Sequence, residues 1–158
     1  MKNFLLFLFL TSLAASQHPV PKPAPSAQPD VSGMYAFLKE GEFVEVDVDA
    51  ERVSGFISRF GETNSDHGMV LDHMFTKGTF DGKNLAFSTR ELHGVSYEFK
   101  GVIVRGEAKQ QGGEGYFVIK GTLTETTVDA DKKPSARARE VELKSLPSEA
   151  QPAAAKKD

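Results

Sequence analysis

The chain has 158 residues, with 19 Lys and Arg against 22 Asp and Glu for a net charge of −3, and it contains no cysteine. This mixed, mildly acidic charge argues against nucleic acid or an anionic membrane as a partner. The missing cysteines exclude disulfides, thiolate chemistry and a cysteine-linked lipid anchor.

Residues 1–16, MKNFLLFLFLTSLAAS, have the build of a secretory signal peptide. Lys2 precedes an apolar run from Phe4 to Leu10, which tapers into small residues and predicts cleavage after Ser16. The run is too short for a hydrocarbon core about 30 Å thick, which needs roughly 20 apolar residues. We therefore expect an exported protein, periplasmic or extracellular, that is not inserted in a membrane after cleavage.

Proline separates a central domain from two tails. Residues 17–31 are proline-rich and predict an extended, disordered linker, whereas no proline occurs between Asp30 and Lys133. Residues 147–158 lack large apolar side chains and predict a disordered tail. The remaining residues, 32–146, are enough for one domain with a single modest core.

Alternation of apolar and polar residues predicts strands. In Phe43–Asp49 three valines share one face and three acidic residues the other, which also argues against an outer-membrane barrel. The same pattern predicts seven more strands, and no stretch has a helical period: Gly33–Lys39, Arg52–Phe60, Met69–Phe80, Asn84–Glu91, Val95–Arg105, Tyr116–Thr126 and Arg139–Leu146.

The connections between these strands are short and often contain glycine, which favours sequential antiparallel pairing. Mid-strand glycines at 55, 101 and 121 permit the bends that a closing sheet needs. The predicted fold class is therefore all-β: an eight-stranded antiparallel up-and-down meander that closes into a small barrel. A two-sheet β-sandwich is the alternative.

An exported eight-stranded meander that opens with Gly33-Met34-Tyr35 resembles the lipocalin-type (calycin) barrels, whose first strand carries a Gly-x-Trp signature. Tyrosine stands here in place of tryptophan, and the disulfide and N-terminal helix are absent. The stretches SDHG, HGVSYEFKG and EGYFVIKGTL resemble those of small exported bacterial proteins of unknown function. The resemblance covers most of residues 32–146 and implies a lipocalin-like barrel and a bacterial source, without a particular activity.

Two Asp-His pairs, Asp66-His67 and Asp72-His73, raise the question of a metal or proton-transfer site. A strand rises about 3.3 Å per residue, which sets His67 and His73 roughly 20 Å apart and prevents a shared metal. His73 shares its face with apolar residues, so a hydrogen-bonded core histidine is the simpler interpretation. Asp66 is expected to bond backbone groups of its own loop.

In a meander, alternate connections lie at the same end of the barrel. One end therefore gathers Asp66, His67 and His93, with Arg59 at a nearby strand end, and we expect an open mouth there. A carboxylate and two imidazoles are possible zinc ligands, but loop histidines are usually solvated, so no metal or cofactor is predicted. This end consists of the connections Lys39–Glu42, Gly61–Gly68, Glu91–Gly94 and Thr127–Ala138.

The preferred hypothesis is a binding protein that takes a small apolar or amphipathic ligand at the mouth. One alternative is a non-catalytic envelope or interaction protein with a filled barrel. A second is an enzyme that uses the mouth-loop His and Asp residues, but no nucleophile-elbow, zinc-protease, Walker or dinucleotide motif supports it. The candidate ligand contacts are Arg59, His73, Tyr97, Phe99, Asp66, His67 and His93.

Overall fold

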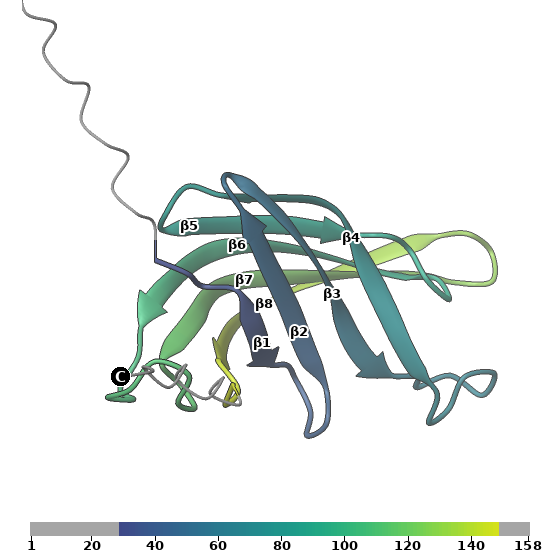
Figure 1. Ribbon diagram of the computed structural model, residues 1–158. Helices are drawn as coiled ribbons and strands as arrows, with labels where there is room; N and C mark the ends of the chain where they lie inside the picture. Colours follow the sequence, from purple (N-terminus) through teal and green to yellow (C-terminus); the bar gives the residue numbers. More distant parts are fainter. Residues whose placement is uncertain (1–28, 149–158) are drawn as a thin grey trace, which may run out of the picture.

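The computed structural model describes residues 29–148 (Figure 1), and within this range it contains eight strands and no helix. The described residues accordingly offer no helix that is long and apolar enough to span a membrane. The strands are β1 (Gly33–Ala36), β2 (Phe43–Asp49), β3 (Arg52–Phe60), β4 (Val70–Phe80), β5 (Asn84–Thr89), β6 (Val95–Arg105), β7 (Phe117–Val128) and β8 (Pro134–Lys144).

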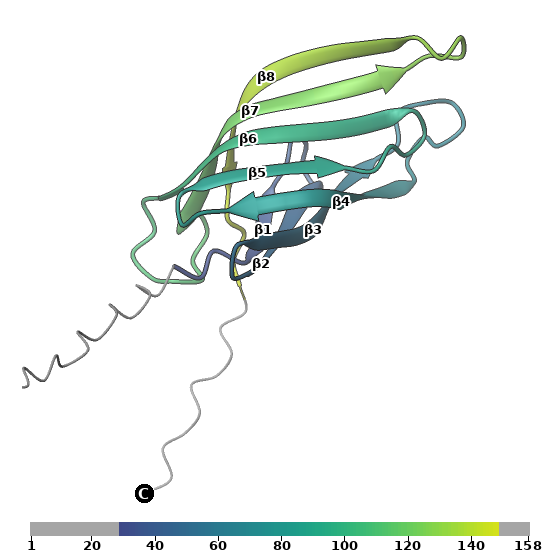
Figure 2. The ribbon, with the colours of Figure 1, turned by 90° about the horizontal axis from the view of Figure 1, so that it is seen from above.

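All eight strands form one sheet in sequence order, and every neighbouring pair is antiparallel. This confirms the predicted all-β meander, curled into a half-barrel in place of two separate sheets. Figure 2 shows β1 to β3 crossing beneath the layer of β5 to β8. The two edges of the sheet meet where Tyr35 lies opposite Ser145 and the Leu146 amide donates to the Met34 carbonyl at 2.7 Å.

Two of the predicted bend glycines allow β6 and β7 to approach each other closely. Gly101 lies directly opposite Gly121. A Cβ atom on Gly121 would be 2.4 Å from the Lys100 carbonyl oxygen and 2.5 Å from the Gly101 Cα. Real side chains do not tolerate such distances, so only glycine fits this part of the sheet.

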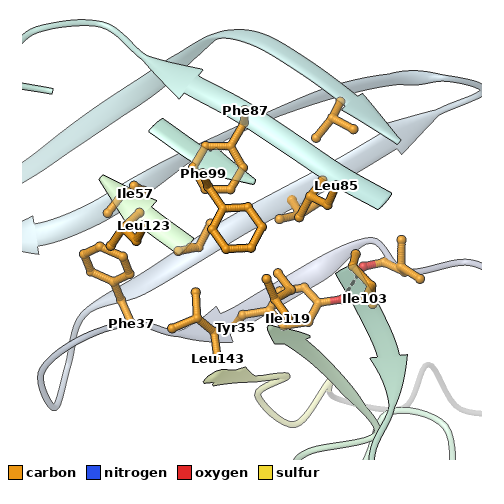
Figure 3. Close-up of a cluster of buried hydrophobic side chains, with 14 of the residues drawn as sticks. Tyr35, Phe37, Ile57, Leu85, Phe87, Phe99, Ile103, Ile119, Leu123 and Leu143 are labelled. Atoms are coloured by element: carbon orange, nitrogen blue, oxygen red, sulfur yellow. Dashed lines mark hydrogen bonds between the residues drawn. The ribbon is translucent and has the colours of Figure 1, made fainter. Parts of the chain in front are cut away.

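Side chains from the concave inner face fill the barrel, as Figure 3 shows. Phe87 stacks on Phe75 at a ring-centroid distance of 4.2 Å and on Phe99 at 5.2 Å. The buried Tyr35 hydroxyl donates to the Val31 carbonyl at 2.6 Å, which satisfies its polar group inside the core. The interior is therefore a packed core of aromatic and branched side chains.

The last strand begins at Pro134, five residues before the predicted start at Arg139, so the predicted loop Thr127–Ala138 is wrong. It shrinks to a turn over residues 129–133. The first half of β8 is exposed on both faces, which removes the apolar alternation that identifies a strand. Antiparallel backbone pairing with β7 holds this half of β8 in the sheet.

At the domain boundaries, Val31 of the predicted linker is buried in the core. At the other end the Ser148 amide bonds the Gly112 carbonyl at 3.0 Å. The predicted signal peptide, residues 17–28 of the linker and residues 149–158 of the tail lie outside the described residues.

Candidate functional site

Three of the predicted site residues meet at the end of the barrel formed by residues 37–42, 61–69, 90–94 and 129–133, here called the polar end. Arg59 on β3, His73 on β4 and Tyr97 on β6 are all buried. The Arg59 Nη1 atom donates to the Tyr97 hydroxyl at 2.7 Å, and the His73 ring lies edge-on to the Tyr97 ring at 5.2 Å. Three strands that are distant in sequence thus bring a guanidinium, a phenol and an imidazole together.

Arg59 is a buried cation without a carboxylate partner. Its side chain is 8% exposed, and none of the ion pairs among residues 29–148 includes it. Its Nε atom is buried and has no hydrogen-bond partner. Burial lowers the pKa of Arg59, but the Tyr97 hydrogen bond and nearby Glu62 raise it further, so the guanidinium stays charged.

His73 is fully buried, as expected of a core histidine, but the expected hydrogen bond is missing. Both ring nitrogens lack a partner, although backbone groups of Arg90 and Val95 lie near enough to favour the protonated form. Burial, followed by the charge of Arg59, lowers the pKa of His73. The imidazole is therefore neutral at pH 7 and keeps one unused donor and one unused acceptor.

Glu125 and Arg139 extend this cluster across the sheet. Glu125 lies opposite Tyr97, and the Arg139 Nη2 atom donates to its carboxylate at 2.9 Å. The Arg139 Nε atom, like that of Arg59, is buried without a partner. We call Arg59, His73, Tyr97, Glu125 and Arg139 the polar layer. It contains every buried side-chain nitrogen or oxygen of the described residues that lacks a hydrogen-bond partner.

Asp66 and His93 also meet, as the meander topology predicts. The buried Asp66 carboxylate accepts hydrogen bonds from the Thr63 amide and hydroxyl at 2.8 and 2.6 Å, and it lies 3.0 Å from His93 Nδ1. His67 is exposed and instead forms a backbone bridge with Gly61. No group of three potential metal ligands forms within residues 29–148.

The predicted ligand contacts Tyr97 and Phe99 belong to the packed core. Tyr97 and Phe99 are each 1% exposed, and Ile103 is also buried. Two surface grooves lie at the opposite end of the barrel from the polar end. The larger, of about 840 Å³, lies between the start of β1 and the loop before β7, and the other, of about 750 Å³, lies beside the turn between β4 and β5.

The sequence pattern did not predict an apolar surface that lies on the convex side of β1 to β4. The described residues contain five exposed large apolar side chains, 38–62% accessible, and all five lie on β1, β3 or β4 or directly before β4. Phe43 and Phe56 join them, with ring centroids 5.8 Å apart. Met69 alternates with Val70 and so points away from the convex side, whereas the other four exposed side chains and this pair lie on it. We call these six the outer apolar face: Met34, Phe43, Phe56, Phe60, Val70 and Met74.

The strand register makes this surface continuous. Met34 lies opposite Glu45, Glu45 opposite Phe56, and Phe56 opposite Met74, so one row crosses four strands. Asp72 lies two residues before Met74 on the same face of β4, opposite Ser58. The surface has two carboxylates, those of Glu45 and Asp72. The surface is therefore apolar at its centre and acidic within and beside it.

The convex side of β6 to β8 is different, because charged and hydroxyl side chains cover it. Thr122 donates to Glu140 at 2.6 Å, and Lys120 pairs with Glu142 at 3.0 Å. The concentration of apolar side chains is thus a property of one half of the sheet.

No protein-family model matches the sequence, no curated protein is significantly similar to it, and no solved structure is significantly similar to its fold.

Proposed function

We propose that this protein is an exported, non-catalytic docking protein whose outer apolar face binds an apolar segment of a partner protein flanked by lysine or arginine. One observation carries the proposal: four of the five exposed large apolar side chains of the described residues lie on one convex surface. Isolated exposed apolar residues are ordinary, but a contiguous patch is typical of an interaction site.

The chemistry of the face fits such a segment. Met34 and Met74 have flexible, polarisable side chains that can adapt to the shape of a partner. Glu45 and Asp72 place carboxylates within and beside the apolar surface, where basic residues of a partner would pair with them. The same carboxylates disfavour an anionic lipid surface, and a dimer through this face would bring the carboxylates of both copies into one interface.

The packed interior supports a surface role over ligand binding inside the barrel. The residues expected to line a cavity instead pack on one another, as the stacking of Phe87 on Phe99 illustrates. Eight strands leave an interior just wide enough for side chains to fill. In this proposal the lipocalin-like resemblance concerns the architecture of the sheet and implies no hollow barrel.

The proposal is tested with a short labelled peptide that has a leucine segment flanked by lysines, titrated against the protein by fluorescence anisotropy. We expect saturable binding that weakens at least about tenfold in Met74→Asp, because an added carboxylate must be desolvated in an apolar contact. Ala136→Asp places the same charge on the convex side of β8 and serves as the control, with unchanged affinity expected.

A peptide of equal length with glutamate in place of lysine should bind far more weakly, since it would face Glu45 and Asp72. Equal binding of both peptides, or equal binding by Met74→Asp and wild type, would contradict the proposal. Self-association in sedimentation velocity that Met74→Asp abolishes would show that a second copy occupies the face, and would also contradict it.

A further inference from the structure

We infer that the polar layer is a carboxylate-binding site, in which Arg59 receives the carboxylate of a small monoanionic ligand that has a short apolar chain. This site is separate from the outer apolar face, because its residues point into the concave side of the sheet. The inference begins from the unmet hydrogen-bonding capacity of Arg59, the one cation of the layer that lacks an acidic partner.

The unpaired edge of the buried Arg59 guanidinium has the geometry that a carboxylate requires. Nη1 is already bonded to the Tyr97 hydroxyl, which fixes the plane of the group. Nε is buried and has no hydrogen-bond partner. The Nε and Nη2 hydrogens form the fork that binds a carboxylate through two parallel hydrogen bonds.

The charge of the polar layer also favours an anion. Arg59 and Arg139 supply two guanidinium groups, and Glu125 supplies the one carboxylate of the layer, bonded to Arg139. Glu62 and Glu125 lie near enough to attract Arg59, but each is bonded to another cation, Lys39 or Arg139, and Glu42 accepts from the Phe60 amide at 3.1 Å. A buried cation is costly unless it is paired, and a bound carboxylate would give Arg59 the direct ion pair that it lacks.

The position of the layer limits the size of the ligand. Below it the core is packed, so the ligand must approach along the concave side of β6 to β8, beyond the short first strand. The half-buried Val95, two residues from Tyr97 on the same face, offers an apolar contact there, and Arg137 lies opposite Glu125 at the open side. A short monocarboxylate matches one guanidinium fork and one small apolar wall.

The test uses the full mature chain, ¹⁵N-labelled on arginine, with sodium hexanoate as the probe. We expect saturable shifts of the Arg59 Nε–Hε resonance, and no such shift with hexan-1-ol, which has the same chain without the charge. Arg59→Lys keeps the charge but lacks the fork, so hexanoate affinity should fall at least about tenfold. Arg52→Lys, on the exposed far end of the same strand, is the matched control and should bind as wild type.

Tyr97→Phe removes the hydroxyl that orients Arg59 and keeps the ring, so we expect hexanoate affinity to fall several-fold. If Arg59→Lys does not fold, the hexanoate affinity of Tyr97→Phe and the arginine spectrum of the wild type still test the inference. Hexanoate shifts that spread over several arginines, equal responses to hexanoate and hexan-1-ol, or unchanged affinity in both polar-layer variants would overturn the inference.

Discussion

Asp66 and His93 lie 27 residues apart in sequence, yet the Asp66 Oδ2 and His93 Nδ1 atoms are 3.0 Å apart and join two loops at the polar end. Asp66 also accepts two hydrogen bonds from Thr63, so one buried carboxylate holds its own loop and the β5–β6 turn. His93 has a φ of 52°, a left-handed backbone conformation that its contact with Asp66 helps to retain.

This arrangement predicts acid-dependent stability. The Thr63 hydroxyl, then the Thr63 amide and His93, lower the pKa of Asp66. A lowered pKa in the folded state adds stability above the unfolded-state pKa of about 3.9, and this stability is lost as the pH falls through the folded pKa. The melting temperature should therefore decrease at pH values below about 4, and it should decrease less in Asp66→Asn. Parallel curves for wild type and Asp66→Asn would contradict the assignment.

Gly121→Val tests the close approach of β6 and β7. Valine has a higher strand propensity than glycine, but its Cβ would collide with the Lys100 carbonyl oxygen and the Gly101 Cα. We expect the free energy of unfolding to fall by about 1–3 kcal/mol in urea denaturation. Unchanged or increased stability would mean that the two backbones can separate freely at this point.

His73→Leu tests whether the buried imidazole stabilises the fold. Both ring nitrogens lack partners, so replacing them with an apolar group of similar size should leave stability unchanged or raise it by up to about 1 kcal/mol. Urea denaturation at pH 7 measures the difference. A loss of more than about 2 kcal/mol would indicate that the imidazole has bonding partners in the folded protein.

The charges on β8 predict resistance to edge-to-edge pairing. In an antiparallel pairing of two copies of β8, the register centred on Ala138 opposes Arg137 to Arg139, and the one centred on Val141 opposes Glu140 to Glu142. Glu140→Thr with Glu142→Thr should therefore increase self-association in sedimentation velocity. Glu98→Thr with Glu107→Thr makes the same change in net charge away from this edge and should leave it unchanged. Equal behaviour of the two double variants would show that the edge charges have no such role.

Much of the fold follows from local patterns in the sequence. Alternation correctly bounded β2, β3 and β6, and short connections correctly predicted sequential pairing. Topology alone predicted that Asp66 and His93 would meet. The start of β8 was missed because its first residues are exposed on both faces, so no apolar period marks them.

The outer apolar face was missed for a different reason. The valines of β2 correctly identify its buried face, and Glu45 and Asp47 then suggest that the other face is solvated throughout. Phe43 lies on that second face, and only the pairing of β2 with β3 shows that it meets Phe56. A sequence pattern assigns faces within one strand, but the register between strands decides whether exposed apolar residues form a surface.

Of the three methionines among the described residues, Met34 and Met74 belong to the outer apolar face, so photo-methionine at these two positions labels this surface. Cells that produce the labelled protein would be irradiated, and the cross-linked peptides identified by mass spectrometry. We predict adducts from Met34 or Met74 to an apolar segment of another protein flanked by lysine or arginine, and loss of those adducts at Met34 in Met74→Asp but not in Ala136→Asp. Adducts confined to lipid or to a second copy of this chain, or adducts unaffected by Met74→Asp, would contradict the proposed docking role.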